Sequence, residues 1–140
     1  MTLFGKQHVD RYIATDGAEG YEWRNGTTIL LLTTTGRRSG NQYIHPLIYR
    51  DSGENYVIVA SKGGSDDPPE WYENLVVNPD VEVQIKGEKF KARARTATPD
   101  EKPALWQRMV EVWPDYDNYQ KRTDREIPVV VLEPIQTAWR

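Results

Sequence analysis

The feature that most constrains the fold is the stretch 33–62 and the strand leading into it, in which short apolar runs alternate with loops rich in glycine and cations. Residues 28–33 form an apolar run, β-branched at several positions and stopped by Gly36, which indicates a buried strand. Residues 44–50 and 56–61 have the same character. These three strands are expected to form an antiparallel meander.

Two loops at the ends of these strands share an unusual composition. The turn 34–40 contains two glycines, two arginines and several hydroxyls, and residues 61–64 read Ser-Lys-Gly-Gly. Bidentate arginine matches phosphate oxygens, and glycine lets backbone N–H groups approach an anion. The two loops therefore indicate an anion-binding cradle. For the first loop taken alone, an ordinary polar hairpin turn remains the alternative, because neither the dinucleotide fingerprint nor the Walker motif is present.

The remainder of the chain alternates between helix and strand signals. An aspartate cap and prolines precede one helix, and Thr98 with Pro99 and Glu101 opens another that Pro114 ends or kinks. The further elements predicted are a helix that follows the aspartate cap in 65–69 and ends at about Val77, strands at 81–85 and 90–95, a helix after Thr98, a short helix within 115–125 and a strand at 127–132. About six strands, mostly antiparallel, with two to four helices indicate an α+β domain built as a closed or split β-barrel.

A chain of 140 residues is expected to form one domain with a sizeable core. Residues 1–26 are weakly patterned and are assigned to an N-terminal extension with a short packing helix that ends near Thr15. Within this extension, His8 is expected to be solvated. Residues 27–134 form the barrel domain, and residues 135–140 are a tail.

Composition excludes several classes of function. Eighteen Lys and Arg against 21 Asp and Glu give a net charge of −3 with no basic block, so nucleic-acid binding is not expected. With no cysteine and two histidines, neither disulfides nor a transition-metal site is expected. No signal peptide and no run of about 20 apolar residues is visible. A cytoplasmic protein, at most peripheral to a membrane, is therefore predicted.

Seven short motifs occur along the chain. They are TTGRRSG at 34–40, HPL at 45–47, VASKGG at 59–64, PEWYENL at 69–75, NP at 78–79, WPDYDNYQ at 113–120 and IPVVVLEP at 127–134. As a set, in this order, they resemble the deazaflavin-dependent nitroreductase family over about residues 27–134. The resemblance implies an FMN-binding-like split β-barrel oxidoreductase that uses coenzyme F420 in its reduced form as hydride donor.

The resemblance also implies where the coenzyme lies. Its phosphate and glutamate tail is expected against the basic turn, and its ring system beside the Ser-Lys-Gly-Gly loop and the helix that follows. The implied coenzyme-binding residues are Arg37, Arg38, Pro46, Ser61, Lys62, Gly63, Trp71 and Asn74. An acidic protein that binds a multiply charged anion needs such a local cluster of cations.

Two tyrosines are candidates for catalysis. Tyr116 and Tyr119 could deliver a proton to the reduced product or orient a carbonyl, although solvent could serve instead and tyrosines at this spacing also cover core edges. His45 lies beside a proline on a predicted strand without a carboxylate partner nearby, which favours a structural role. Two positions depart from the resembled family: Tyr43 stands where many relatives have an arginine that helps to hold the acidic tail, and Trp113 stands where some have a substrate-pocket tyrosine.

The predicted function is therefore an F420H2-dependent reductase acting on a small electron-poor acceptor, namely an activated enone or lactone, a quinone or a nitroaromatic. The alternatives are a non-catalytic carrier of F420 or flavin with the same fold, and an FMN- or haem-binding relative. Both a monomer and a homodimer remain open, because edge strands and aromatic helices can close within one chain or across two.

Overall fold

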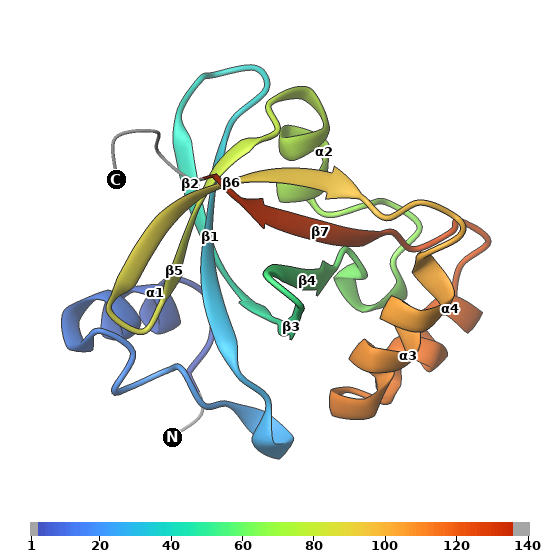
Figure 1. The fold of residues 1–140 in the computed structure, drawn as a ribbon, viewed down its shortest axis with the longest axis horizontal. Helices are drawn as coiled ribbons and strands as arrows, with labels where there is room; N and C mark the ends of the chain where they lie inside the picture. Colours follow the sequence, from blue (N-terminus) through green and yellow to red (C-terminus); the bar gives the residue numbers. More distant parts are fainter. Residues whose placement is uncertain (1–2, 136–140) are drawn as a thin grey trace.

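A computed structural model describes residues 3–135, and its centre is one antiparallel sheet (Figure 1). Within these residues the sheet has seven strands: β1 (Ile29–Thr35), β2 (Gln42–Ile48), β3 (Arg50–Ser52), β4 (Asn55–Val59), β5 (Asp80–Ile85), β6 (Glu88–Thr96) and β7 (Val129–Pro134). Their order across the sheet is β2-β1-β5-β6-β7-β4-β3. The predicted α+β split barrel is confirmed.

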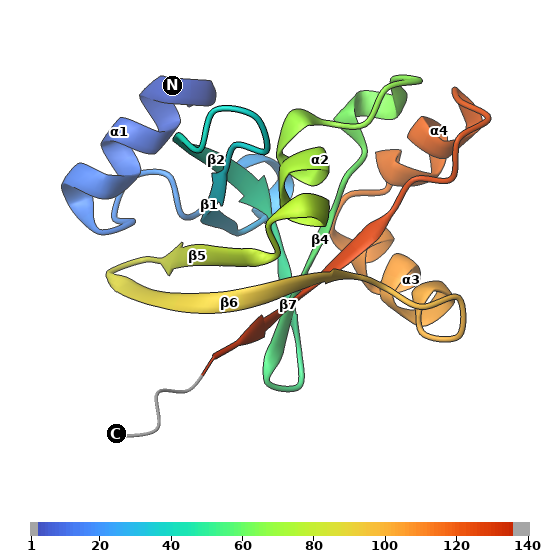
Figure 2. The ribbon, with the colours of Figure 1, turned by 90° about the horizontal axis from the view of Figure 1, so that it is seen from above.

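Four α-helices and two 3₁₀ turns surround the sheet within the described residues. They are α1 (Gly5–Thr15), α2 (Glu70–Val77), α3 (Lys102–Val112) and α4 (Asp115–Lys121), with the turns Arg24–Gly26 and Lys62–Gly64. Figure 2 shows α1 beside β1 and β2 at one end of the molecule, α3 and α4 together at the other end, and α2 between them. The site described below lies between these three groups of helices.

The sheet is curled because one bent segment occupies both of its ends. β2 and β3 are separated only by Tyr49, yet they are the two outermost strands of the sheet. Tyr49 is buried at the bend, and its backbone N–H donates to the Thr28 carbonyl at 3.1 Å. The single strand predicted at 44–50 is therefore wrong, and seven strands replace six. Its two halves do pair with β1 and β4, as the predicted meander requires.

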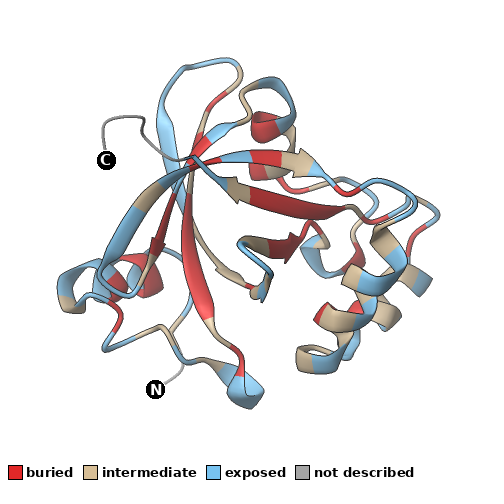
Figure 3. Ribbon diagram, viewed as in Figure 1, coloured by how far each residue is buried: buried red, intermediate tan, exposed pale blue. Residues whose placement is uncertain are grey.

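Both faces of β4 and β7 are covered, which explains the apolar runs 57–60 and 129–132. Ile58 and Leu132 point into the barrel core, whereas Val57 and Val131 point toward α3 and α4. Figure 3 shows these two strands as largely buried. Each side chain of this size contributes about 1.5–3 kcal/mol when it is fully buried.

The helix α3 begins later than the sequence predicts. The capping pattern at Thr98 forms as expected, since the Thr98 N–H donates to Glu101 Oε2 at 2.8 Å and the Glu101 N–H donates to Thr98 Oγ1 at 3.4 Å. These bonds close a turn, and regular helix starts only at the next residue, Lys102.

The predicted hairpin is confirmed as β5 and β6, with Val83 opposite Phe90.

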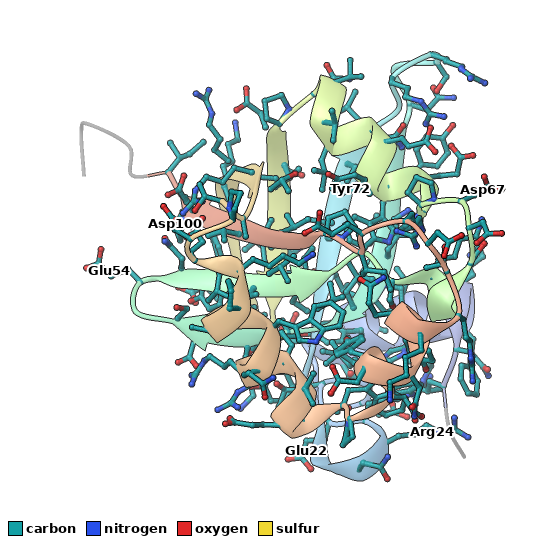
Figure 4. The ribbon with its side chains drawn as sticks, turned by 90° about the vertical axis from the view of Figure 1, so that its right-hand side faces the viewer. Glu22, Arg24, Glu54, Asp67, Tyr72 and Asp100 are labelled. Atoms are coloured by element: carbon teal, nitrogen blue, oxygen red, sulfur yellow. The ribbon has the colours of Figure 1, made fainter. Side chains whose placement is uncertain are left out.

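The predicted aspartate cap of α2 is wrong. The N-cap residue is Pro69, which makes no side-chain cap bond, and Asp66 Oδ1 instead accepts from the Thr123 hydroxyl at 2.7 Å. Asp67 lies at the outside of the same loop and points away from the ribbon (Figure 4). The carboxylate that local spacing assigns to the helix is therefore used to attach this loop to a segment almost sixty residues later.

The predicted N-terminal helix is confirmed, and it ends at Thr15. The expectation for His8 was wrong: its side chain is buried, with 2% of the residue exposed, and Nε2 donates to the Gly20 carbonyl at 2.7 Å. The reason is that His8 shares the helix face of Val9 and Tyr12, which packs on β1.

No helix within residues 3–135 is both long enough and apolar enough to cross a membrane. Of the predicted tail, residues 136–140 lie outside the described part.

Candidate functional site

One cavity brings together most of the predicted site residues. It has a volume of about 390 Å³ and lies between the N-terminal segment, β2, the Lys62–Gly64 turn, α2 and the α3–α4 junction. Pockets of about 300–1,000 Å³ are typical for small-molecule ligands. The predicted residues that line it are Pro46, Ser61, Lys62, Gly63, Trp71, Tyr116 and Tyr119.

A second hollow of about 370 Å³ contains the remaining predicted residues, Arg37, Arg38 and Asn74. The two hollows share two walls. On α2, Trp71 lines the first cavity while Asn74 lines the second, and on β2 the neighbouring residues Pro46 and His45 divide in the same way. The candidate site is therefore an aromatic cavity that adjoins a cationic hollow along α2.

In the basic turn, Arg37 is bound by residues of α2. Its Nη1 donates at 2.8 Å to both Glu70 Oε2 and Asn74 Oδ1, and its Nη2 lies 2.9 Å from Glu73 Oε2. The backbone N–H of Arg37 also donates to Asn74 Oδ1 at 3.2 Å. The hydrogen bond with Arg37 lowers the pKa of the Glu70 carboxyl, and the nearby positive charge lowers it further. Arg38, by contrast, is exposed.

The turn itself is closed by glycine. The Gly36 N–H donates to the Asn41 carbonyl at 2.7 Å, and a Cβ on Gly36 would lie 2.7 Å from Ser39 Oγ. Tyr43, the position where the resembled family has an arginine, shares a 3.2 Å hydrogen bond between its hydroxyl and Ser39 Oγ. The second hollow therefore has a phenol side chain at this wall.

The Lys62–Gly64 turn has an uncommon backbone. Lys62, Gly63 and Gly64 have φ angles of 46°, 63° and 83°, all in the left-handed region. A Cβ on Gly64 would lie 2.5 Å from the Tyr119 carbonyl oxygen, whereas a Cβ on Gly63 would meet no atom within 4 Å. Gly64 thus allows α4 to approach closely, and Gly63 leaves the backbone open to the cavity.

Arg125 fixes this turn, and sequence analysis missed it. Its guanidinium donates to the carbonyls of Ser61 at 2.8 Å and Ser65 at 2.7 Å, with a longer contact of 3.3 Å to the carbonyl of Ala60. These acceptors lie at least sixty residues earlier in the chain, so no local pattern links them to Arg125. An arginine in the polar tract just before the last strand was the only available signal.

An aromatic wall from the N-terminal segment closes the cavity and was also missed. Trp23 stacks on Trp113 with ring centroids 5.7 Å apart, and its Nε1–H donates to the Leu3 carbonyl at 3.0 Å. Trp113 Nε1–H in turn donates to the Tyr119 hydroxyl at 3.2 Å. Trp23 and Trp113 both line the cavity, so the described part of the N-terminal extension, residues 3–26, contributes to the site as well as to packing.

The two candidate tyrosines differ in their surroundings. Tyr116 is 5% exposed, and burial raises the pKa of its phenol, which keeps the hydroxyl protonated at neutral pH. Within residues 3–135 the Tyr116 hydroxyl makes no hydrogen bond, although Tyr116 lines the cavity. The Tyr119 hydroxyl accepts from Trp113. Burial lowers the pKa of His45, which lies in the cationic hollow.

A split barrel with an aromatic cavity and adjoining cations defines a class of coenzyme-binding oxidoreductases. Within that class the chain belongs to the family described as F420H(2)-dependent quinone reductase, whose family model matches residues 4–134. A Mycobacterium tuberculosis protein named F420H(2)-dependent quinone reductase is 41% identical over 128 residues, which cover 89% of this chain and 86% of that protein.

Two solved structures support the same assignment. One, titled as an F420-H2-dependent reductase (FDR-A), is 40% identical with a TM-score of 0.70 and covers 75% of this chain and 93% of its own. The other, titled as a domain-swapped dimer, is 36% identical with a TM-score of 0.73 and covers 91% and 96%. The membership of an F420-dependent family that the series of motifs indicated is confirmed. The protein is an F420-dependent oxidoreductase, and reduced coenzyme F420 is the hydride donor of its family.

Proposed function

We propose that the protein transfers a hydride from reduced F420 to a quinone, with activated enones, lactones and nitroaromatics as further acceptors to be tested. The observation that carries the proposal is the joining of the aromatic cavity to the cationic hollow along α2. A ligand with a planar ring system and an anionic tail matches both parts. The names of the similar proteins favour quinones among the acceptors.

The residues present fit such a coenzyme. Pro46 and Trp71 provide flat apolar surfaces for a ring system, and Gly63 leaves room for it beside the backbone. Arg38 and Lys62 are exposed cations at the edge of the site and suit a phosphate and carboxylates. When bound, the coenzyme supplies the hydride, while the protein positions the two reactants and excludes water.

Tyr116 is the proposed proton donor. Its phenol is protonated and lines the cavity, so it can hydrogen-bond an acceptor carbonyl where negative charge develops. Transfer of its proton to that oxygen leaves a phenolate, which takes a proton from solvent before the next turnover. Tyr119 holds the edge of the same wall through Trp113 and Tyr116, whose ring lies 6.1 Å from its own. The stack of Trp23 on Trp113 limits the access of water to this end of the cavity.

The test is to mix the protein with reduced F420 and a panel of acceptors, and to follow reoxidation of the coenzyme by its absorbance. Acceptor-dependent reoxidation is expected, and Tyr116→Phe is expected to reduce kcat about 10–100-fold with little change in coenzyme affinity. Tyr119→Phe, which keeps the ring, is the matched control and should have the smaller effect.

Other outcomes would select the alternatives. Coenzyme binding without turnover on any acceptor would favour a non-catalytic carrier. A flavin or haem band in the spectrum of the purified protein would favour a different cofactor. Absence of both binding and reoxidation would reject the proposal.

We also propose that the site is complete within one chain. The cavity is lined by the N-terminal segment, by residues of β1, β2 and β4, by α2 and by α4 of the same molecule. Light scattering combined with activity measurements across a dilution series tests this point. Activity that falls in step with dissociation of a dimer would contradict it.

A further inference from the structure

The cation best placed in the hollow is already neutralised by this chain. The Arg37 side chain is 17% exposed and forms ion pairs with two carboxylates, that of Glu70 at 2.8 Å and that of Glu73 at 2.9 Å. An anionic ligand that approaches Arg37 must therefore either displace a carboxylate or be repelled by it. The exposed pairing position is the one that Glu70 occupies, because its side chain is 74% exposed whereas that of Glu73 is 38% exposed.

Glu70 also lies within the field of the other two cations of the site. The positive charges of Arg38 and Lys62 act on its carboxyl in addition to that of Arg37. The first residue of α2 is therefore an anion that is paired with Arg37 at 2.8 Å and that also feels the positive charges of two further cations. This is the arrangement expected for a bound anionic ligand, and here a side chain provides the anion.

We propose that Glu70 is an internal competitor that occupies the anion position at Arg37 and sets how strongly the protein binds ligands with an anionic tail. The identity of the ligand rests on the function proposed above, whereas the competition applies to any polyanion that reaches the hollow. A tail that displaces Glu70 exchanges one charge-assisted bond for another at Arg37 and gains new bonds only at Arg38 and Lys62. Tails with several neighbouring anionic groups are therefore favoured over tails with one.

The opposite role would be that Glu70 positions Arg37 for the ligand. The contacts argue against it, because Arg37 keeps three other bonds when Glu70 leaves. These are the ion pair with Glu73, the side-chain bond to Asn74 Oδ1 and the backbone bond to the same oxygen. The guanidinium is thus fixed by α2 without Glu70, and the two roles predict changes of opposite sign.

The decisive variant is Glu70→Gln, which keeps the shape of the side chain and removes its charge. Fluorescence titration is expected to show about three- to tenfold tighter binding of coenzyme F420, because an exposed ion pair and a repulsive charge are both removed. The deazaflavin with its ribityl chain but without phosphate and glutamates should bind as it does to the wild type. In an Arg37→Ala background, Glu70→Gln should have a much smaller effect.

The matched control is Glu82→Gln, which makes the same change in net charge at an exposed position on β5, in a different hollow. It should leave coenzyme affinity unchanged. Isothermal titration with inorganic triphosphate repeats the comparison with an anion that needs no aromatic cavity. Triphosphate is also expected to bind Glu70→Gln about three- to tenfold more tightly.

The outcomes separate the two proposals. Weaker or unchanged binding of both F420 and triphosphate to Glu70→Gln would overturn the competitor role. If F420 binds no variant while triphosphate binds Glu70→Gln more tightly, the competitor role stands and the proposed function fails. If both ligands bind Glu70→Gln more tightly and Glu82→Gln does so equally, the effect is one of net charge and the competitor role is rejected.

Discussion

Two loops beside α2 have nearly the same composition and different physical roles. The basic turn contains glycine, serine and cations, the Lys62–Gly64 turn with the preceding Ser61 does so too, and each borders one of the two hollows. In the basic turn the cation Arg37 is paired by carboxylates of α2. Among the described residues Lys62 has no such ion pair, and its loop is held through backbone carbonyls by Arg125.

The difference shows that a glycine- and cation-rich loop can provide either charge or shape. The basic turn provides charge, and the carboxylates on α2 regulate how much of it a ligand meets. The Lys62–Gly64 turn provides a left-handed backbone that fits against α4 and remains open at Gly63. Substitutions that change shape should therefore act mainly at the second loop, and substitutions that change charge should act on both.

The largest effect is expected for shape, at Gly64. The variant Gly64→Ala combines a left-handed φ with a Cβ placed 2.5 Å from the Tyr119 carbonyl oxygen, and should lower the free energy of unfolding by about 3 kcal/mol. The control Gly63→Ala meets open space and should lower it by about 1 kcal/mol. Urea denaturation measures both values. Equal effects would contradict the close approach of α4.

A combined loss of charge from both loops should have the next largest effect. The double variant Arg38→Ala/Lys62→Ala removes two exposed cations and should weaken F420 binding at least about 100-fold. Lys89→Ala/Lys91→Ala on β6 makes the same change in net charge away from both hollows and is the control. Coenzyme affinity is measured by fluorescence titration. An unchanged affinity of Arg38→Ala/Lys62→Ala would show that these two cations do not form the anion-binding site.

Loss of the Arg125 hydrogen bonds that hold the Lys62–Gly64 turn should have an intermediate effect on coenzyme affinity. Arg125→Lys keeps the charge but cannot reach the carbonyls of Ser61 and Ser65 together, so coenzyme affinity should fall about tenfold as the turn loosens. Arg122→Lys, which loses a single 3.3 Å bond to the Gly63 carbonyl, is the control. Equal F420 affinities for the two variants in the same titration would show that the Arg125 hydrogen bonds have no part in coenzyme binding.

The smallest effect is a pH dependence that belongs to the basic turn. Arg37 lowers the pKa of Glu70 in the folded protein below its usual value of 4.5. The contribution of this pair to stability is therefore present above about pH 4.5 and is lost as the pH falls through the folded value. Because Glu70 is largely exposed, the change is small. A comparison of melting temperatures between pH 3 and 7 should show a slightly weaker dependence for Glu70→Gln than for the wild type.

Much of the site could be predicted because it is encoded in short segments. The glycines, serines and cations of the two loops are contiguous in sequence, and the structure places all ten predicted residues around the two hollows. What could not be predicted is how they are paired. Arg37 meets Glu70 across thirty-three positions, and Arg125 meets Ser61 across sixty-four, so their contacts exist only after the barrel has closed.

For the fold, too, some features could be predicted from the sequence and others could not. Alternation of apolar and polar residues identified the hairpin β5–β6, because side-chain periodicity is a local consequence of strand geometry, and a short apolar run identified the buried β1. The sequence alone therefore determined most of the elements, the class of fold and the chemical types gathered in the loops. Only the tertiary structure decided that the strand bends at Tyr49 to close the barrel, that His8 and Trp23 turn inward, and that Glu70 occupies the anion position. The physical reason is that burial and ion pairing depend on which surfaces meet, and the surfaces that meet here lie far apart along the chain.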